Sequence, residues 1–195
     1  MEQDRLDIRE YLNGNMSAFQ RLYGRYERQL FFYILSMIRQ TQNTEDLFQD
    51  VWMQVIKKLP GFSFKGEFRN WIYTIAHHKV IDYIRANSKG DTVNLEDQLA
   101  GQEERNLHDV LTDPAPGIPR QLAVKELFDK VRVVVDTLPE EQREVFLLRC
   151  DAGMKFKEIA IMLEISINTV LGRMHYAQKR IRQELHQEYY EYESR

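Results

Sequence analysis

Cationic and hydrogen-bonding side chains recur at helical spacing near the C-terminal end of this 195-residue chain. No acidic residue occurs between Ile165 and Gln183, so a helix formed there would carry a basic and polar outer side. In a helix-turn-helix, side chains of this kind on the second helix bind DNA phosphates and base edges. An amphipathic helix pair with a solvated basic face gives the same pattern, so both interpretations stay open. With about 100° between successive residues, the residues on that side are Asn168, Gly172, His175, Tyr176, Lys179 and Arg182.

Two helices and a short turn would hold these side chains in place. Ile159, Ala160 and Leu163 give the first helix an apolar stripe. Ser166 is a candidate N-cap of the second helix, because a serine hydroxyl can accept a hydrogen bond from the first backbone N–H groups. The inward face of the second helix is expected to comprise Val170, Met174, Ala177 and Ile181.

A second set of polar side chains lies between Gly61 and Lys89. The pattern predicts a helix from about Glu67 to Ala86, preceded by a loop between Gly61 and Gly66. The buried side of this helix is expected to comprise Phe68, Ile72, Ile75, Ala76, Val80 and Tyr83. The opposite arc of about 100° contains no acid and comprises Asn70, Thr74, His77, His78 and Arg85.

The loop before this helix combines the aromatic residues Phe62 and Phe64 with Lys65. Rings that stack on bases beside a cation that holds the backbone are typical of single-strand binding proteins. Plain core filling is the competing interpretation for these rings and for Phe68 and Trp71. His77 and His78 diverge by about 100° on a helix and have no cysteine pair beside them, so we expect no metal site.

The segment from Asn43 to Leu59 is strongly amphipathic. Asn43 is the expected N-cap of its helix, with Asp46 in the first turn. The side expected to be buried comprises Leu47, Phe48, Val51, Trp52, Val55, Ile56 and Leu59. Another side holds Asp46, Gln49, Asp50 and Met53. Acids beside a methionine suit the docking of a basic partner helix, although an ordinary solvated face fits the same pattern.

The net charge of the chain hides a strong unevenness along the sequence. Overall the charge is −3 and the pI is near 6.0, which is not typical of a nucleic-acid binder. From Asp91 to Asp113 there are seven acids and one base, whereas from Lys65 to Lys89 there are five bases and two acids. Local basic faces, and not the overall charge, bind phosphate.

Helical patterns without sheet-type alternation predict an all-α fold of two small helical domains. The first domain is expected to span residues 1–90 and the second residues 120–188, followed by a tail at 189–195. Residues 91–119 are acidic and end in a proline cluster, which is typical of a flexible linker. Pro139 is expected to open a helix, and Gly153 to interrupt the pattern before Phe156.

Several classes of protein are disfavoured by the sequence. Cys150 is the single cysteine, which rules out an intrachain disulfide, and we expect it in the core. The charged N-terminus lacks the apolar run of a signal peptide, and no segment is long and apolar enough to span a membrane, so we expect a cytoplasmic protein. Since no nucleophile elbow, P-loop or metal-ligand set is found, we expect no enzyme and no cofactor.

Taken in order, these segments resemble those of bacterial sigma factors of the extracytoplasmic-function group. Residues 15–37 look like the opening helix pair of that family. The segment NTEDLFQDVWMQVIKKL is similar to its EDLxQExF-type core-binding helix, and FRNWIYTIAHHKVIDYIR to its FRxWLYxIAxNxxIDxxR promoter-melting helix. Residues 138–185 are similar to its LPxxxRxVFLLRxxxGxxxxEIAxxLxxSxxTVKSRxxRAxxxLR module.

The resemblance implies a fold and a set of roles. The N-terminal domain would dock on the β′ clamp helices of RNA polymerase and melt the −10 element, and the C-terminal domain, near the β flap, would read the −35 element. The residues expected at the polymerase are Asp46, Gln49, Asp50 and Met53. Those expected at the −10 strand are Phe64, Lys65, Asn70, Thr74, His77, His78 and Arg85. Those expected at the −35 element are Asn168, Thr169, Gly172, Arg173, His175, Tyr176, Lys179 and Arg182. The resemblance also admits an anti-sigma factor as a partner.

The chain departs from the family pattern mainly in the C-terminal module. Leu171, Gly172, Tyr176 and Gln178 stand where the family usually has lysine, serine and two arginines, Glu164 replaces the usual turn glycine, and His78 replaces a common asparagine. Fewer cations release fewer counterions, which predicts weaker and less salt-sensitive DNA binding. Two other functions therefore stay open, a stand-alone helix-turn-helix regulator and a sigma-like antagonist that binds polymerase or an anti-sigma factor without binding DNA.

Overall fold

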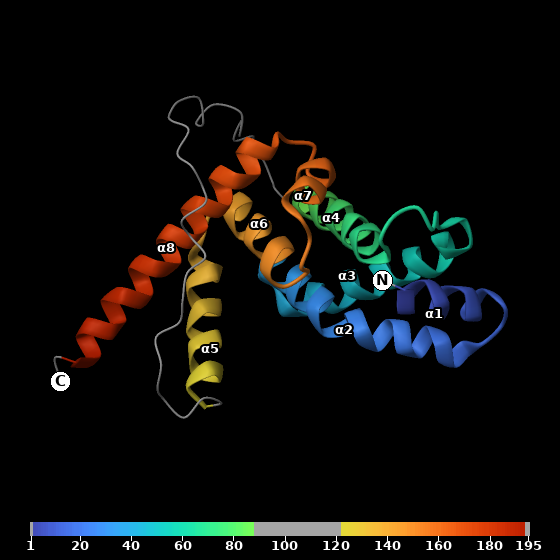
Figure 1. The fold of residues 1–195 in the computed structure, drawn as a ribbon, viewed down its shortest axis with the longest axis horizontal. Coiled ribbons are helices and arrows are strands. Elements are labelled where there is room, and N and C mark those ends of the chain that lie inside the picture. The colour runs from blue at the N-terminus through green and yellow to red at the C-terminus, as the bar shows by residue number, and fades with distance from the viewer. Residues whose placement is uncertain (1, 88–121, 194–195) are drawn as a thin grey trace.

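The computed structural model of this chain describes residues 2–87 and 122–193, with side chains placed for residues 2–87 and 130–185. Every regular element within these residues is helical, which confirms the all-α prediction. The first part contains α1 (Glu2–Leu12), α2 (Met16–Ile38), α3 (Thr41–Lys58), the short 3-10 helix η1 (Leu59–Gly61) and α4 (Phe68–Asn87). The second part contains α5 (Leu122–Thr137), α6 (Glu140–Cys150), α7 (Phe156–Met162) and α8 (Ile167–Glu193) (Figure 1). The predicted linker at 91–119 lies outside the described residues.

Helix α2 is the centre of the N-terminal bundle and contacts α1, α3 and α4. Its side chains at Leu22, Leu30 and Ile34 are completely buried, as expected for an apolar face that repeats every three or four residues. Val51 and Val55 of α3 are also completely buried. Burial of a side chain of this size stabilises a fold by about 2 kcal/mol.

Helix α4 begins and ends one residue later than predicted. Phe68, Ile72, Ile75, Ala76 and Val80 are buried, which confirms most of the predicted stripe. Tyr83 is only partly buried, and its hydroxyl donates a hydrogen bond to Oε1 of Gln40 at 2.9 Å. Tyr73, which was not predicted in the core, is 1% exposed, because α4 is covered by α7 as well as by α2 and α3.

Two predictions for α3 are wrong. The helix begins at Thr41, so Asn43 lies inside it and does not cap it; the Asn43 amide instead donates to the Gln40 side chain and the Tyr83 hydroxyl. Ile56, predicted to be buried, is 36% exposed. Its neighbours Trp52 and Val55 take the positions that face the core, which leaves Ile56 at the edge of the apolar stripe.

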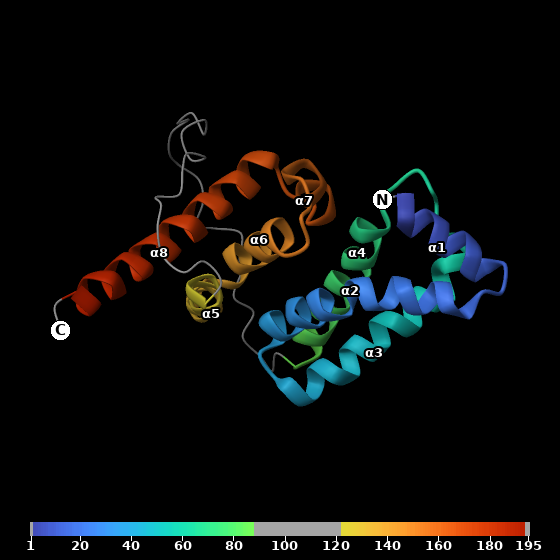
Figure 2. The same ribbon diagram turned by 60° about the horizontal axis from the view of Figure 1, so that its bottom comes forward.

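The C-terminal helices pack around α8, which contacts α5, α6 and α7 (Figure 2). The predicted inward face of α8 is confirmed, since Val170, Met174, Ala177 and Ile181 are all buried. Cys150, predicted in the core, is exposed. It follows buried Leu148 by two residues, and two residues on a helix lie about 200° apart. Helix α8 also continues to Glu193, through most of the segment predicted as a tail.

The two parts of the molecule touch each other. Helix α2 contacts α6, and the α4 helix contacts α7, which brings together segments on either side of residues 88–121 (Figure 2). Nη1 of Arg69 on α4 donates to the carbonyl oxygen of Ala152 at 3.0 Å. Among the described residues, no helix is both long and apolar enough to cross a membrane.

Two buried acids fix α1 against α2. Asp4 is 6% exposed and Asp7 is completely buried, although both have acidic side chains. The Asp7 carboxylate accepts hydrogen bonds from Nε of Arg21 at 2.9 Å and from Nη2 of Arg25 at 2.8 Å. Burial alone would raise the pKa of Asp7, but the hydrogen bonds from Arg25 and Arg21 outweigh it and leave that pKa below its usual value.

Replacing Asp7 should therefore destabilise the N-terminal bundle. We expect Asp7→Ala to lower the free energy of unfolding by ~2 kcal/mol, because Arg21 and Arg25 lose a buried carboxylate partner but stay partly solvated. The measurement is urea unfolding followed by circular dichroism. Glu10→Ala is the matched control, since Glu10 binds the same Arg21 at the surface and should change stability far less.

The contribution of Asp7 to the free energy of unfolding should also depend on pH, and it should decrease as the pH falls. A carboxyl group whose pKa is lowered by folding stabilises the native state above its unfolded pKa, and this contribution is lost as pH falls through the lowered value. The stability difference between wild type and Asp7→Ala should therefore shrink on acidification. An equal difference at neutral and strongly acidic pH would contradict this account.

Candidate nucleic-acid and protein interfaces

The outer side of α3 is open to solvent. Asp46, Gln49, Asp50 and Met53 are all exposed, and Met53 has 66% of its surface accessible. Nζ of Lys79 on α4 lies 3.2 Å from a carboxylate oxygen of Asp50, which neutralises part of the acidic strip. Together with exposed Ile56, these side chains form a strip that is acidic at one end and apolar at the other.

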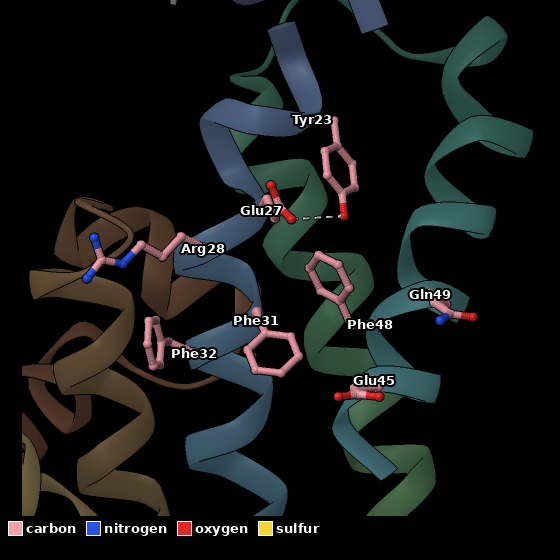
Figure 3. A pocket seen from close by; sticks show the side chains of 8 residues that line it. All are labelled: Tyr23, Glu27, Arg28, Phe31, Phe32, Glu45, Phe48 and Gln49. Carbon is pink, nitrogen blue, oxygen red and sulfur yellow. Dashed lines mark hydrogen bonds between the residues drawn. The ribbon is translucent and has the colours of Figure 1, made fainter. Parts of the chain in front are cut away.

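A shallow aromatic groove of about 440 Å³ lies between α2 and α3. Figure 3 shows Tyr23, Phe31 and Phe48 around it, with the Tyr23 hydroxyl directed at Glu27. That hydroxyl donates to Oε1 of Glu27 at 3.4 Å. Gln49 lines the groove as well, so the groove adjoins the α3 strip. Sequence analysis did not single out this groove, although Tyr23, Glu27 and Phe31 follow at intervals of four residues.

The residues expected at the −10 strand divide into open and covered positions. Lys65, His78 and Arg85 are exposed. Phe64 is partly buried: its ring lies 5.5 Å from that of Phe62, and the Arg9 guanidinium lies 5.2 Å from its centre. Thr74 is partly buried and donates its hydroxyl to the carbonyl oxygen of Asn70 at 2.8 Å. The Asn70 side-chain oxygen is buried without a hydrogen-bond partner among the described residues.

His77 lies against the C-terminal helices and not on the open surface. Its Nδ1 is 2.7 Å from Oε1 of Glu144 on α6, and 15% of its side chain is exposed. Because an ionised carboxylate can only accept, the His77 Nδ1–H donates in this contact. The Tyr33 hydroxyl donates to the same oxygen at 2.7 Å. Burial, and then the Glu144 carboxylate, hold the pKa of Tyr33 well above its usual range, so the hydroxyl remains a donor.

The predicted turn of the helix-turn-helix is present between α7 and α8. The Ser166 hydroxyl accepts from the Thr169 backbone N–H at 3.0 Å, which confirms the predicted N-cap. Helix α7 ends in a Schellman motif, with Ile165 N–H donating to the Ala160 carbonyl at 3.1 Å. Glu164 occupies the left-handed position of this motif with a φ of 57°.

The outer side of α8 presents mixed polar groups. Asn168, His175, Tyr176, Lys179 and Arg182 are exposed, whereas Thr169, Gly172 and Arg173 are partly covered. Nη2 of Arg173 lies 3.2 Å from a carboxylate oxygen of Glu141 on α6, and 16% of the Arg173 side chain is accessible. Gly172 has no atom within 4 Å of the position that a Cβ would take, so packing does not require a glycine there.

Sequence analysis did not identify Glu144 on α6 as the partner that covers His77. Glu144 is 6% exposed and precedes buried Leu147 and Leu148 by three and four residues, so it lies on the apolar side of α6. An acid in such a stripe is a signal that it has a partner. Its partners, Tyr33 and His77, are 111 and 67 residues away in the sequence.

Two family models match the chain in the order expected from these helices. The Sigma-70 region 2 model matches residues 22–90, which include α3 and α4. The Sigma-70 region 4 model matches residues 128–181, which include α6, α7 and most of the polar side of α8. The chain belongs to the extracytoplasmic-function group of the sigma-70 family.

Curated relatives of this sigma factor match it over most of their length. The ECF RNA polymerase sigma factor SigX of Bacillus subtilis (strain 168) is 28% identical over 86% of this chain and 84% of its own. SigW of the same organism is 25% identical over 91% of this chain and 94% of its own.

Solved structures share the fold. CnrH, in complex with the cytosolic domain of CnrY, has a TM-score of 0.61 at 22% identity and covers 94% of this chain and 97% of its own. RpoE of Bartonella quintana, in complex with the anti-sigma factor NepR, has a TM-score of 0.60 at 21% identity, over 86% of this chain and 96% of its own. At this level of identity the comparison supports the fold alone.

The left-handed backbone at Glu164 gives a stability prediction. A residue with a Cβ in this conformation costs about 1 kcal/mol relative to glycine, so Glu164→Gly should raise the free energy of unfolding by up to ~1 kcal/mol. Thermal unfolding of the full chain provides the measurement. Glu164→Ala removes the carboxylate but keeps the Cβ, and a gain of the same size in this variant would show that backbone strain is not the cause.

Proposed function

We propose that this sigma factor binds core RNA polymerase through the outer side of α3 and then directs transcription from promoters that both of its helical domains contact. The observation that carries the proposal is the exposed α3 strip. Its acids and Met53 face solvent while the opposite side of α3 is buried in the core. Such a strip suits a partner helix that supplies both cations and apolar side chains, because charge complementarity adds specificity to apolar burial. The neighbouring groove offers Tyr23, Phe31 and Phe48 for the apolar part of the contact.

Opening of the −10 element would use the loop and the exposed side of α4. Lys65, His78 and Arg85 are exposed and available for the strand backbone. The ring of Phe64 would stack on a base, although it is partly buried and lies beside Phe62 and Arg9. The predicted contacts of Asn70 and Thr74 require a modest rearrangement, because both side chains are partly covered. We assign residues 1–90 to this role.

The −35 element would be contacted by the polar side of α8 within residues 120–188. Lys179 and Arg182 supply phosphate contacts, while Asn168, His175 and Tyr176 are in reach of base edges. Arg173 is held by Glu141, so it would reach phosphate only by exchanging partners. We infer that the protein is not an enzyme, because binding of polymerase and DNA accounts for the exposed polar groups.

An anti-sigma factor in the cytoplasm is proposed as a regulatory partner. The structures of CnrH with the cytosolic domain of CnrY and of RpoE with the anti-sigma factor NepR support this proposal by their shared fold. The stand-alone regulator and the sigma-like antagonist are not favoured, because the region 2 and region 4 models both match and the relatives are sigma factors.

Transcription in vitro tests the proposed function. Bacterial core polymerase is given fragmented DNA of the source genome with and without the protein, and RNA 5′ ends are mapped by sequencing. We expect discrete new start sites that share upstream −10 and −35 motifs. Stable binding to core without new starts would instead identify an antagonist, and absence of binding to core would identify a stand-alone regulator.

The α3 strip gives a mutational prediction. Asp50→Arg should weaken binding to core polymerase at least about tenfold, since it reverses a charge at a contact between complementary surfaces. Co-elution with core on gel filtration and the yield of the mapped transcripts are the measurements. Asp46→Arg should act in the same direction without disturbing the Asp50–Lys79 pair. Glu2→Arg, an equal charge change at an exposed position on α1, is the control, and an equal loss in this variant would rule out the assigned strip.

A further inference from the structure

Gly172 lies at the centre of the outer side of helix α8. At about 100° per residue, it points within ~10° of the direction opposite the middle of the buried face of this helix. Asn168 and Tyr176 lie one turn before it and one turn after it, and both are exposed. The outermost line of α8 therefore carries a bare stretch of backbone between two polar side chains.

The fold itself gives no reason for a glycine at this position. Glycine inside a helix lowers its stability relative to alanine. At Gly172 no atom lies within 4 Å of the position of a Cβ, and the backbone is not in the left-handed region. Gly24 on α2 has equally open surroundings, so open space alone does not identify a contact. Gly172 differs from Gly24 because it lies within the acid-free stretch between Ile165 and Gln183.

The first turns of α8 are held in a fixed orientation. The Ser166 hydroxyl accepts from the Thr169 backbone N–H at 3.0 Å, which anchors the start of the helix. Nη2 of Arg173 lies 3.2 Å from a carboxylate oxygen of Glu141 on α6, which anchors the helix one residue after Gly172. Because these contacts resist rotation of α8, the residue at its outermost position sets how deeply the helix can enter a groove.

The dimensions of DNA make that position critical. The major groove is ~12 Å wide and an α-helix with its side chains is ~10–12 Å across, so the fit leaves little room. A helix without a side chain at its outermost position sits deeper. The short amide side chain of Asn168 reaches base edges only from a helix that lies close to them. Lys179, two turns beyond Asn168 on the same side, is exposed and has a long side chain suited to phosphate.

We propose that Gly172 is the point at which α8 approaches the bases of the −35 element most closely, so that a side chain there displaces the helix. The proposal rests on the proposed −35 role of α8. Gly172 is a positioning residue, because it has no side-chain group that binds a base and acts by letting Asn168 and Tyr176 reach them. The absence of nearby acids along this side allows the backbone to approach DNA without repulsion.

A single added methyl group should change stability and recognition in opposite directions. Gly172→Ala should raise the temperature of unfolding by up to ~4 °C, because alanine is the better helix former. The same substitution should weaken recognition of the −35 element by about tenfold, because a displaced helix loses contacts with base edges. A purely structural role of Gly172 would not give this combination.

The test compares four full-length proteins, each bound to core polymerase. They are wild type, Gly172→Ala, Gly24→Ala and Lys179→Ala. Gly24→Ala is the matched control, because it adds the same methyl group to an exposed helical glycine with open surroundings on α2. It should raise the temperature of unfolding without changing −35 recognition. Lys179→Ala removes a phosphate contact, so it should weaken binding to every duplex and reduce the salt slope by about one.

Two duplexes separate −35 recognition from the rest of promoter binding. One is a mapped promoter, and the other is the same promoter with an unrelated sequence in place of the −35 element. The ratio of the two affinities, measured by fluorescence anisotropy, isolates recognition of that element. Gly172→Ala should lower this ratio about tenfold and leave the salt dependence unchanged, because no charge is lost. Thermal unfolding of each free protein provides the stability measurement.

An unchanged ratio for Gly172→Ala would overturn the proposal, while a wild-type ratio well above one would still support the −35 role of α8. A wild-type ratio near one would reject that role and the proposal with it, so the two failures are distinct. Lower stability of Gly172→Ala would also overturn the proposal, because it would show that the fold requires the glycine. So would an equal loss on both duplexes with a smaller salt slope, since that result would indicate a phosphate contact.

Discussion

Burial of helix α2 is the constraint on which the rest of the structure depends. This helix contacts α1, α3 and α4 within its own domain, and it also contacts α6 of the other domain. Its buried side chains, such as Leu22, Leu30 and Ile34, gain stability by leaving water, and three neighbouring helices must supply the partner surface. Once α3 and α4 are packed on α2, only their remaining sides can meet polymerase or DNA.

The exposed sides of α3 and α4 differ in charge, so they suit different proposed partners. The outer side of α3 carries acids and Met53, whereas the exposed part of α4 and the loop before it carries Lys65, His78 and Arg85. Acidic side chains repel phosphate, and basic side chains attract it. The ion pair between Lys79 and Asp50 lies where the two surfaces meet. A molecule with a net charge of −3 can therefore still present a local surface for nucleic acid.

Much of the fold and part of the site could be predicted from the sequence. The inward face of α8 and the N-cap at Ser166 followed from spacing and capping chemistry, which are local. The predicted N-cap at Asn43 was wrong because α3 begins two residues earlier, at Thr41, and the Asn43 amide donates to Tyr83, which is 40 residues away. The exposure of Cys150 could have been expected from its angular offset relative to Leu148, whereas the partial covering of His77 could not.

The sequence by itself determined the helices, the sides they bury, the exposed acids of α3 and the family to which the chain belongs. These features depend on residues three or four positions apart, which a helix brings together wherever it packs. Only the tertiary structure decided that Glu144 meets Tyr33 and His77, and that Arg69 meets the turn at Gly153. Those contacts join residues that are 67 to 111 positions apart, and their existence depends on how whole helices are placed against one another.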